Sequence, residues 1–577
     1  MELDKEKRVM LAFALTFVML ILYRVFFMKE QPPPPKKSTP TTSAPAVPGQ
    51  LPAIPTTSAP PQATKAAPPV ALPVVEGKKA EEIVVENLNY RVTFSTEGAV
   101  VRSWVIKGYP KGELVDTVNG PACAALGYPM SVSVADSALN AQLNQAIYIV
   151  EAAKLVVGNE PEKLSGSPFT PPVALTFTYS DGKVLVKKRF VFREDYTVKV
   201  TVSATEGQTG FPLAVAWPGG FGDQSLPVAV TENYREAVYG SVGGLTRLPQ
   251  RKMKEDRSIS GPLQLAGMED KYFADIFLPD APEEVAFRLA RQEWSPPNGT
   301  EKEKPRPLLA DLAETQAKPL AFRLFVGPKD LDVLKAVNPP LDSIVDFGWF
   351  SFVAKPLFIA MRYIYDHWVH NYGWAIVLLT LAINVAMFPL KLKSLRSMQE
   401  MQRVAPIIKG IQDKYKQYKF NDPRKQKMNE EVMKVYSEHH INPFGSCLPQ
   451  LALLPFLYGF YRVLDLSIEL RHAPWFLWVK DLSAPDPLYI LPGIMVVTMF
   501  ILQRMTPMTS ADPAQQRMMM ITPLVFGVMF FRLAAGLNLY WATSNVIGLV
   551  QQVFINRRMR SQDPLLAPVR KSAGAKV

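Results

Sequence analysis

The stretch GWAIVLLTLAINVAMFPL, residues 373–390, decides how this chain is interpreted. It is long and apolar enough to cross most of a lipid bilayer. Asn384 is its one strongly polar side chain, and an amide at that depth is unfavourable unless it faces a partner helix or a water-filled cavity. The stretch therefore predicts a membrane-embedded structure that requires internal polarity.

Apolar residues are distributed unevenly along the chain. Of the 577 residues, 48% are hydrophobic and 20% are charged. The apolar segments cluster at the N-terminus and after residue 370, and the region between them is typical of soluble β structure. The sequence predicts a multi-domain protein, in which an α-helical polytopic membrane bundle, with a five-span core and an N-terminal anchor span, accompanies an all-β sandwich domain.

Changes in composition give the expected boundaries. The predicted parts are an N-terminal transmembrane anchor (1–30), a Pro-rich disordered linker (31–78), a β-sandwich domain (79–340), an amphipathic interfacial helix (341–372), a five-span core (373–556) with a helical hairpin at 391–440, and a basic tail (557–577). A signal peptide is the alternative for the first part. No small-residue cleavage site follows its apolar run, so an uncleaved anchor with a cytoplasmic N-terminus is expected.

The middle of the chain carries strand signals. Alternating or β-branched runs cover 82–94 and 174–202, and Ser180-Asp181-Gly182-Lys183 is a hairpin signal between two such runs. Helical periodicity is scarce before 331–337. These features predict a large antiparallel sandwich, which would lie outside the cytoplasm because it follows a single span.

Charge tests the expected topology. The net charge of +12 is compatible with nucleic-acid binding, but Lys and Arg concentrate beside the apolar segments, as the positive-inside rule describes. Loop 391–447 holds twelve Lys and Arg against six acids, whereas loop 465–487 is near balance. Both termini are therefore predicted to be cytoplasmic. Cys123 and Cys447 would face different compartments and would not pair.

The segments of the predicted core can be read individually. The five apolar segments are about 373–390, 448–464, 488–503, 518–535 and 537–556. In loop 391–440, apolar residues recur at intervals of three and four on both sides of Asn421-Asp422-Pro423, which predicts two antiparallel amphipathic helices. Their basic face is either simply solvated or a surface for anionic lipid headgroups, ribosomal RNA or a nascent chain. The candidate contacts are Arg396, Arg403, Lys409 and Lys414.

Several motifs resemble those of one family. NPFGSCLP (442–449), followed by Pro455, resembles the NPxGxCxP…P signature of the YidC/Oxa/Alb family of membrane insertases. Further matches in order and spacing are MFPL (387–390), DLSAPDP (481–487), DPAQQ (512–516), GLNLYW (536–541) with Ser544-Asn545, and GMEDKYFA (267–274) in the β region. The resemblance covers nearly the whole chain and is closest in layout to the Gram-negative type with a large periplasmic domain.

The resemblance implies a mechanism and partners. It implies a membrane insertase and chaperone of the inner membrane, with a hydrophilic groove that is open to the cytoplasm and to lipid. The implied partners are nascent integral membrane proteins, the Sec translocon, the ribosome through the cytoplasmic loops and tail, and membrane lipids, with no metal and no cofactor. A wet groove shortens the path that polar groups take through hydrocarbon, and burial of the substrate's apolar segment then drives insertion.

Family members commonly carry an Arg where this chain has Asn384, counted back from Pro389-Leu390. The groove's usual positive charge is therefore missing at this position. Arg462 and Arg532, each roughly 20 Å from the cytoplasmic start of its span, either supply that charge or extend toward the outer headgroups.

Other polar residues are candidates for the substrate groove. Thr380 shares a helix face with Asn384, and Gln450 lies one turn from a position where the family often has a glutamine. Asn538, Trp541 and Asn545 form one stripe on the last span. Each of these residues either lines the groove or only packs the bundle through interhelical hydrogen bonds.

The sequence does not favour an enzyme. It contains no G-x-S-x-G, H-E-x-x-H or Walker motif. The family's periplasmic domain resembles sugar-binding sandwiches such as mutarotases, but this β region contains no histidine, so no such activity is expected. His439-His440 has no third ligand at metal-binding spacing. Two competing functions are a transporter, which usually shows an internal repeat and paired intramembrane charges, and a structural tether in the cell envelope.

Overall fold

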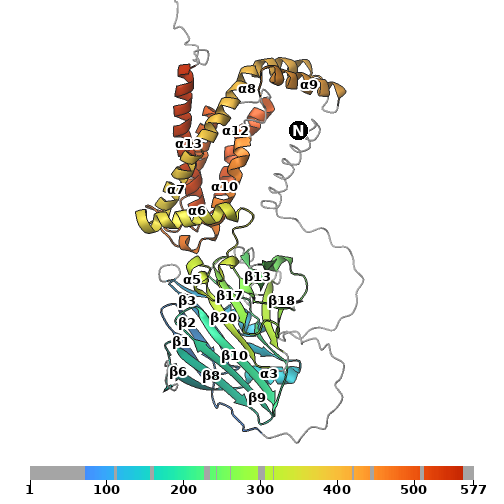
Figure 1. Cartoon of the computed structure of the whole chain (residues 1–577), viewed down its shortest axis with the longest axis vertical. Coiled ribbons are helices and arrows are strands. Elements are labelled where there is room, and N and C mark those ends of the chain that lie inside the picture. Colours follow the sequence, from blue (N-terminus) through green and yellow to red (C-terminus); the bar gives the residue numbers. More distant parts are fainter. Residues whose placement is uncertain are drawn as a thin grey trace, which may run out of the picture. The chain divides into compact units, whose positions relative to one another are not determined.

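The structure is a computed structural model. It describes residues 72–108, 113–155, 162–225, 234–241, 244–259, 261–295, 306–315, 318–418, 422–441, 448–506 and 513–562. These residues belong to one compact unit, Gly49–Val577, in which a β-rich part precedes a helical part (Figure 1). The predicted anchor, most of the linker, residues 442–447 of the NPFGSCLP motif, Asp512 and the tail beyond residue 562 lie outside the described residues.

The β-rich part consists of antiparallel sheets. The first sheet has the order β1 (Glu82–Glu86), β2 (Tyr90–Ser95), β3 (Val100–Lys107) and β4 (Leu114–Asp116). The longest sheet has the order β14 (Gly244–Pro249), β13 (Glu236–Ser241), β16 (Leu265–Glu269), β17 (Phe273–Pro279), β20 (Leu320–Pro328), β10 (Thr197–Glu206), β9 (Val184–Phe192), β8 (Val173–Ser180), β6 (Ile149–Lys154) and β7 (Glu162–Leu164), and β11 (Thr209–Gly210) also pairs with β10. The third sheet has the order β15 (Arg257–Ile259), β18 (Val285–Trp294), β19 (Arg306–Thr315), β12 (Leu213–Trp217) and β5 (Ser131–Ser133).

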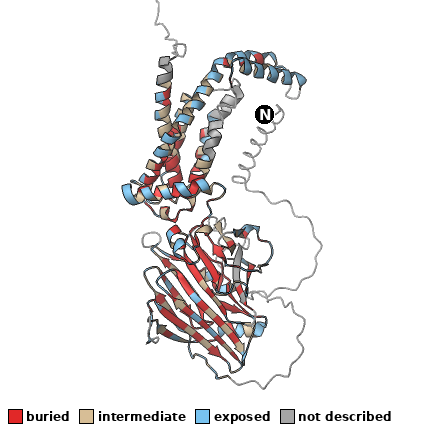
Figure 2. Ribbon diagram, in the orientation of Figure 1, coloured by how far each residue is buried: buried red, intermediate tan, exposed pale blue. Residues whose placement is uncertain are grey.

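Alternation of side chains explains these strands. In β9, every second residue is buried, and the residues between them are exposed or partly exposed, as in a half-buried strand (Figure 2). The predicted hairpin joins β8 to β9. Its Asp181 carboxylate accepts the backbone N–H groups of Lys183 and Val184, both at 2.8 Å, and Gly182 provides the positive φ of 95° that the turn requires.

The β-rich part also contains short helices beside its sheets, and the helix at Leu331–Ala336 lies in the stretch where the sequence shows helical periodicity. They are α2 (Gly120–Leu126), α3 (Ser137–Gln145), η1 (Gln250–Lys252), α5 (Leu331–Ala336) and η2 (Asp342–Ile344). Elements this short complete few turns, so their helical period is weak. Their signal lies in the caps, because Asp136 accepts the backbone N–H of Ala138 at 2.8 Å and Asp330 accepts that of Asp332 at 2.8 Å.

The helical part contains α6 (Ser351–Ile364), the π-helical turn η3 (Tyr365–Val369), α7 (Tyr372–Ala386), α8 (Phe388–Lys414), α9 (Pro423–Glu438), α10 (Leu448–Leu466), η4 (Ile468–Leu470), α11 (Ile490–Met505), α12 (Pro513–Phe530) and α13 (Ala535–Gln562). Helix α13 packs against α7 and α11, and α6 packs against α7 and α10. Helices α7, α10, α11, α12 and α13 occupy the five apolar segments.

Length and hydropathy can be used to ask which of these helices could span a membrane. Taken singly, no helix in the described part of the chain meets a combined length and hydropathy criterion for a membrane span. The bent pair Ser351–Val369 and Tyr372–Ala386, which turns through 117°, meets that criterion jointly.

Helices α8 and α9 lie in the segment for which the sequence predicts a hairpin. Val404, Ile408 and Ile441 form a small buried cluster, against which Val432 and Tyr436 of α9 pack. Asp422 caps α9 by accepting the Arg424 backbone N–H at 2.9 Å, which accounts for the Asn-Asp-Pro break in the sequence. The remaining faces of α8 and α9 are largely exposed (Figure 2).

Candidate functional site

A polar cluster joins α7, the beginning of α8, and α13. The Asn384 amide donates to the Thr380 carbonyl at 2.9 Å and to Ser544 Oγ at 3.3 Å. Lys391 Nζ donates to Asn384 Oδ1 at 2.7 Å and to Gln551 Oε1 at 3.2 Å. The Gln551 amide in turn donates to the Asn384 backbone carbonyl at 3.2 Å. Asn384 is thus a buried amide whose donor and acceptor are both satisfied.

A break between two helices brings Lys391 to this cluster. Helix α7 ends at Ala386 and α8 begins at Phe388, so Lys391 follows Asn384 by about two turns. In the described structure, every polar contact of Lys391 is made to a neutral oxygen and no carboxylate pairs with it. Among the described residues of this cluster, a half-buried ammonium without a counter-charge makes the local electrostatic potential positive.

The structure separates the groove candidates of the last span. Asn538 is fully buried and donates to the Phe530 and Leu533 carbonyls, both at 3.2 Å, so it caps the end of α12. Asn545 donates to the Met495 carbonyl at 3.3 Å and connects α13 to α11. Trp541 packs edge-on against Phe530, with ring centroids 5.3 Å apart. These contacts join the three residues to neighbouring helices, while the buried Oδ1 of Asn538 has no hydrogen-bond partner among the described residues.

Of the other candidates, Thr380 takes part in the cluster only through its backbone carbonyl, whereas Arg462 and Arg532 lie apart from it. Thr380 is buried and donates to the Ile376 carbonyl of its own helix at 2.6 Å. Arg462 donates to the Asp346 carbonyl at 2.8 Å, and Arg532 lines a cavity that also contacts the β-rich part. Neither arginine reaches Asn384. The side chain of Gln450 lies outside the described residues.

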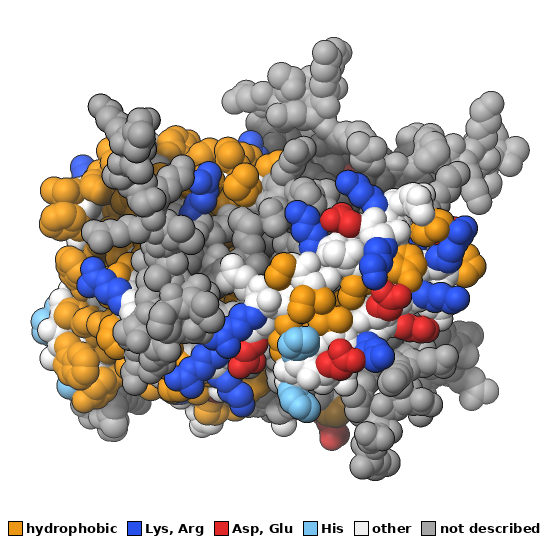
Figure 3. All heavy atoms as spheres, turned by 90° about the horizontal axis from the view of Figure 1, so that it is seen from above, with side chains coloured by type: hydrophobic (Ala, Val, Ile, Leu, Met, Phe, Trp, Pro, Cys, Tyr) orange, Lys and Arg blue, Asp and Glu red, His pale blue; other side chains and the backbone are white. Residues whose placement is uncertain are grey.

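The predicted hairpin cations are on the surface. Arg396, Arg403, Lys409 and Lys414 are exposed on α8. Figure 3 looks onto this end of the helical part and shows Lys and Arg side chains interspersed with fewer Asp and Glu. A mixed but mainly basic surface of this kind suits a contact with phosphate groups.

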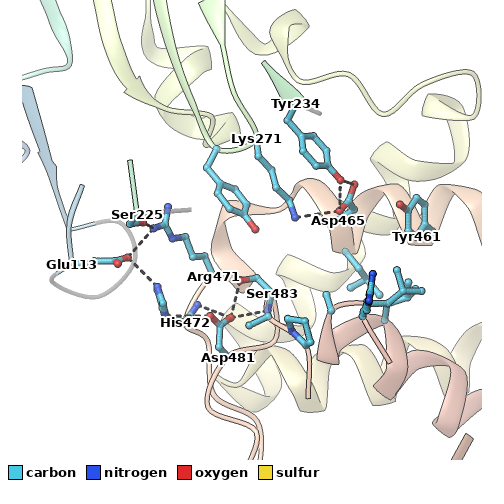
Figure 4. A pocket seen from close by; sticks show the side chains of 18 residues that line it. Glu113, Ser225, Tyr234, Lys271, Tyr461, Asp465, Arg471, His472, Asp481 and Ser483 are labelled. Carbon is cyan, nitrogen blue, oxygen red and sulfur yellow. Dashed lines mark hydrogen bonds and ion pairs between the residues drawn. The ribbon is translucent and has the colours of Figure 1, made fainter. Parts of the chain in front are cut away.

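A second cluster lies where the β-rich part meets the loop between α10 and α11 (Figure 4). Arg471, from that loop, forms an ion pair with Asp223, and both side chains are almost inaccessible to solvent. Arg471 Nη2 also contacts Ser225 Oγ at 2.8 Å and Glu113 at 3.2 Å. His472 contacts Glu113 and Asp481, each at 3.1 Å.

The turn between β16 and β17 supplies the other half of this contact. Asp270 accepts the backbone N–H of Tyr272 and of Phe273, both at 2.8 Å, and that of Asp223 at 2.6 Å. Lys271 then reaches Asp465 at 3.2 Å. The GMEDKYFA motif therefore positions the β-rich part against α10.

Burial and charge shift the titration of these groups. Burial and the nearby Asp465 carboxylate raise the pKa of Tyr234 well above its usual range, so its hydroxyl remains a donor to Asp465 at 2.7 Å. Burial opposes the charge of Lys271, but Tyr272 and Asp465 more than offset it and raise the lysine pKa. The raised pKa of Lys271 favours its ammonium form in this buried contact.

Two further motifs organise the loop between α10 and α11. Asp486 is fully buried and accepts Trp478 Nε1 at 3.0 Å and the backbone N–H of Leu488 and of Leu491 at 3.0 and 2.7 Å. The Gly536 N–H donates to the Leu482 carbonyl at 2.8 Å. The DLSAPDP and GLNLYW motifs are therefore in direct contact through a backbone hydrogen bond.

Sequence reasoning missed Lys391, Ser544, Gln551 and the pair Arg471–Asp223. The spacing of seven residues from Asn384 was an available signal for Lys391, because it equals about two helical turns. The partners of Arg471 had no such signal, since Asp223 is 248 positions away. Across the described part of the chain, no group of three or more His, Cys, Asp or Glu side chains is arranged to hold a metal ion.

Comparisons with known proteins give consistent matches. A family model described as "60Kd inner membrane protein" matches residues 364–562, and one described as "YidC periplasmic domain" matches residues 82–360. "Membrane protein insertase YidC" of Syntrophus aciditrophicus is 32% identical and covers 96% of this chain and 100% of the relative. The protein of the same name from Geobacter metallireducens is 34% identical, with coverages of 97% and 99%. A solved active YidC insertase is 20% identical with a TM-score of 0.33, and the match covers 83% of this chain and 94% of that one.

Proposed function

The chain belongs to the YidC family of membrane protein insertases, and we propose that Lys391, held by Asn384, gives its insertion path a positive charge. The protein acts in the inner membrane on nascent membrane proteins, carries a periplasmic domain and is not an enzyme. The proposal concerns where the substrate's polar segment is received.

The proposed membrane core consists of α7, α10, α11, α12 and α13 as five spans, with both termini cytoplasmic. Large apolar side chains on their outward faces support it. Val497 of α11, Leu524 and Val528 of α12, and Val550 of α13 are between 58% and 67% exposed. Apolar side chains so exposed are expected to face lipid. Exposed aromatic residues such as Phe352 and Tyr363 support α6 as a helix at the membrane interface.

One observation carries the insertion proposal: Lys391 is a half-buried cation whose described partners are all neutral. An acidic segment of a substrate would supply the missing counter-charge. The polar cluster therefore receives hydrophilic segments, and lipid beside the outward faces receives the apolar one. The same proposal includes the domain limits and groove residues expected from the sequence, and cooperation with the Sec translocon. The exposed cations of α8 support a contact with the ribosome.

The test is insertion into proteoliposomes of two model substrates that differ only in an acidic or a neutral outer segment. Lys391→Gln is expected to slow insertion of the acidic substrate about fivefold, equivalent to about 1 kcal/mol for a partly exposed ion pair, and to spare the neutral one. Lys393→Gln, an exposed neighbour, is the matched control. Equal effects on both substrates, or in both variants, would contradict the proposal.

A further inference from the structure

Two glutamates face each other on neighbouring strands near one end of the longest sheet. Glu236 of β13 is paired in register with Glu269 of β16, so their side chains lie on the same face of the sheet as a direct cross-strand pair. The side chain of Glu269 is 1% exposed and that of Glu236 is 26% exposed. Two ionised carboxylates in this arrangement would repel each other, and little water is present to screen them.

Cations flank this pair of carboxyl groups. Arg247 Nε, on β14, is 3.5 Å from Glu236 and 3.3 Å from Glu269. Lys329 Nζ, directly after β20, is 2.8 Å from Glu269. Arg247, Glu269 and Lys329 are the charged groups that act on Glu236 from the elements packed around it in the described structure. Glu269 thus has two close cationic partners, whereas Glu236 shares Arg247 at the longer distance.

Arg247 also contacts the chain where it leaves the β-rich part. Its Nη2 atom donates to the carbonyl of Ser343 at 3.1 Å and to that of Ile344 at 2.8 Å. Both carbonyls belong to η2, the last element before α6. One guanidinium therefore divides its donors between the carboxyl pair and the backbone of η2. A change in the charge of the pair alters the position at which the guanidinium is most stable.

The surroundings of Glu236 favour its protonated form. Burial, the charge of Glu269 and a hydrogen bond between the two carboxyl groups raise the pKa of Glu236 to about 7, although Lys329 and Arg247 act in the opposite direction. A hydrogen bond between two carboxyl groups requires a proton on one of them. The exposed edge of the Glu236 side chain gives that proton access to the periplasmic solution.

We propose that Glu236 and Glu269 share one proton, and that loss of this proton near neutral pH weakens the hydrogen bonds from Arg247 to η2. With the proton present, a single carboxylate faces the two cations. Without it, two carboxylates compete for Arg247 and draw its guanidinium away from Ser343 and Ile344. The connection between the periplasmic domain and α6 is therefore sensitive to pH, and this inference does not depend on how the protein receives its substrates.

Linkage gives the sign of the effect. The pKa of Glu236 is raised above its ordinary value of 4.5 to about 7 in the folded chain, so the folded chain binds this proton more tightly than the unfolded chain does. The contribution to stability is complete below the ordinary value and is lost as the pH rises through the folded one. The connection is expected to be more stable in mildly acidic than in mildly alkaline solution.

Thermal unfolding of the full chain in detergent, between about pH 5 and pH 8, tests the proposal. Glu236→Gln keeps the shape of a protonated carboxyl group and has no charge to gain. The melting temperature of the wild type is expected to fall by about 3–6 °C relative to this variant as the pH rises. Glu284→Gln, at an exposed ion pair with Lys318 in the same domain, is the matched control and should follow the wild type at every pH.

Two further measurements locate the effect. Hydrogen exchange in η2, corrected for the intrinsic dependence of exchange on pH, should become faster in the wild type as the pH rises and stay constant in Glu236→Gln. Arg247→Lys, which keeps the charge but loses the Nη2 donor, should leave η2 less protected at both ends of the range. An infrared difference spectrum between the wild type and Glu236→Gln should show a protonated-carboxyl band in mild acid that disappears in mild alkali.

Each measurement can overturn the proposal. Exchange in η2 of the wild type that does not change with pH would do so without any variant. So would a wild-type melting temperature that follows Glu236→Gln at every pH, the absence of the carboxyl band, or a Glu284→Gln variant that behaves like Glu236→Gln. None of these measurements involves insertion, so failure of the insertion proposal leaves their outcome unaffected.

Discussion

At the scale of single residues, the buried ion pair Arg471–Asp223 requires compensation of both charges by the groups around it. Both side chains are at most 2% exposed, so each charge depends on the other and on the hydrogen bonds around it. A buried ion pair is weak evidence for added stability, but removing one partner leaves an uncompensated charge. The pair therefore acts as a specific connection between the periplasmic domain and the loop after α10.

Removing one charge of this pair should destabilise the protein. Asp223→Asn is expected to cost about 3–5 kcal/mol of unfolding free energy, seen as a lower melting temperature of the full chain in detergent. Glu284→Gln is the control, because its pair with Lys318 is 48% and 63% exposed and should contribute less than about 1 kcal/mol. Similar melting temperatures for the two variants would show that Arg471 finds another partner or becomes solvated.

At the scale of elements, the loop between α10 and α11 contains strained backbone positions. The carboxylates of Asp481 and Asp486 stabilise it. His472, Leu477 and Tyr489 have positive φ angles of 51°, 48° and 55°, which costs free energy for residues other than glycine. Asp481 and Asp486 offset this strain by accepting backbone and side-chain N–H groups. The loop is therefore a preorganised support at the end of the bundle.

Loss of the Asp486 carboxylate should release that support. Asp486→Ala leaves one buried donor, the Leu491 N–H, and two part-buried donors without this acceptor, and an unsatisfied buried donor costs about 1–3 kcal/mol. The variant should melt earlier and should change the fluorescence of Trp478, while Asp486→Asn, which keeps one oxygen acceptor, should be intermediate. Asp366→Ala, at an exposed site on η3, serves as the control. Wild-type stability of Asp486→Ala would contradict this account.

At the scale of the whole molecule, the proposed spans are short. Helices α7, α11 and α12 contain 15, 16 and 18 residues, which correspond to about 22–27 Å. The hydrocarbon core of a typical bilayer is about 30 Å thick. Short spans are accommodated by thinning of the surrounding lipid, and thinner lipid shortens the path of a polar segment.

Insertion should therefore depend on bilayer thickness. The test uses proteoliposomes whose lipids carry 14-, 18- or 22-carbon acyl chains. The insertion rate is expected to be highest in the thinnest bilayer and to fall several-fold toward the thickest. The reason is that hydrophobic mismatch costs fractions of a kcal/mol per ångström. Protein-free vesicles of the same lipids measure spontaneous insertion for subtraction. A rate independent of thickness would contradict the proposed role of the short spans.

Local sequence patterns predicted much of the architecture. Alternating and β-branched runs predicted strands at 82–94 and 174–202, Asp-Gly predicted the β8–β9 turn, and the apolar segments predicted the helical part. These signals are readable because a period or a cap involves only neighbours within a few residues. The motif resemblance identified the family for the same reason, since each motif is contiguous. Short helices such as α2 were missed because they complete too few turns.

The site required tertiary structure. The sequence by itself determined that Asn384 is a polar group in an apolar helix, but only the fold decided that Ser544, 160 positions away, and Lys391 are its partners. It also decided that Arg462 and Arg532 lie away from that cluster and that Arg471 binds Asp223. A side chain's partner depends on how whole helices and sheets pack, which no local period encodes, and packing is what places a charge beside an amide.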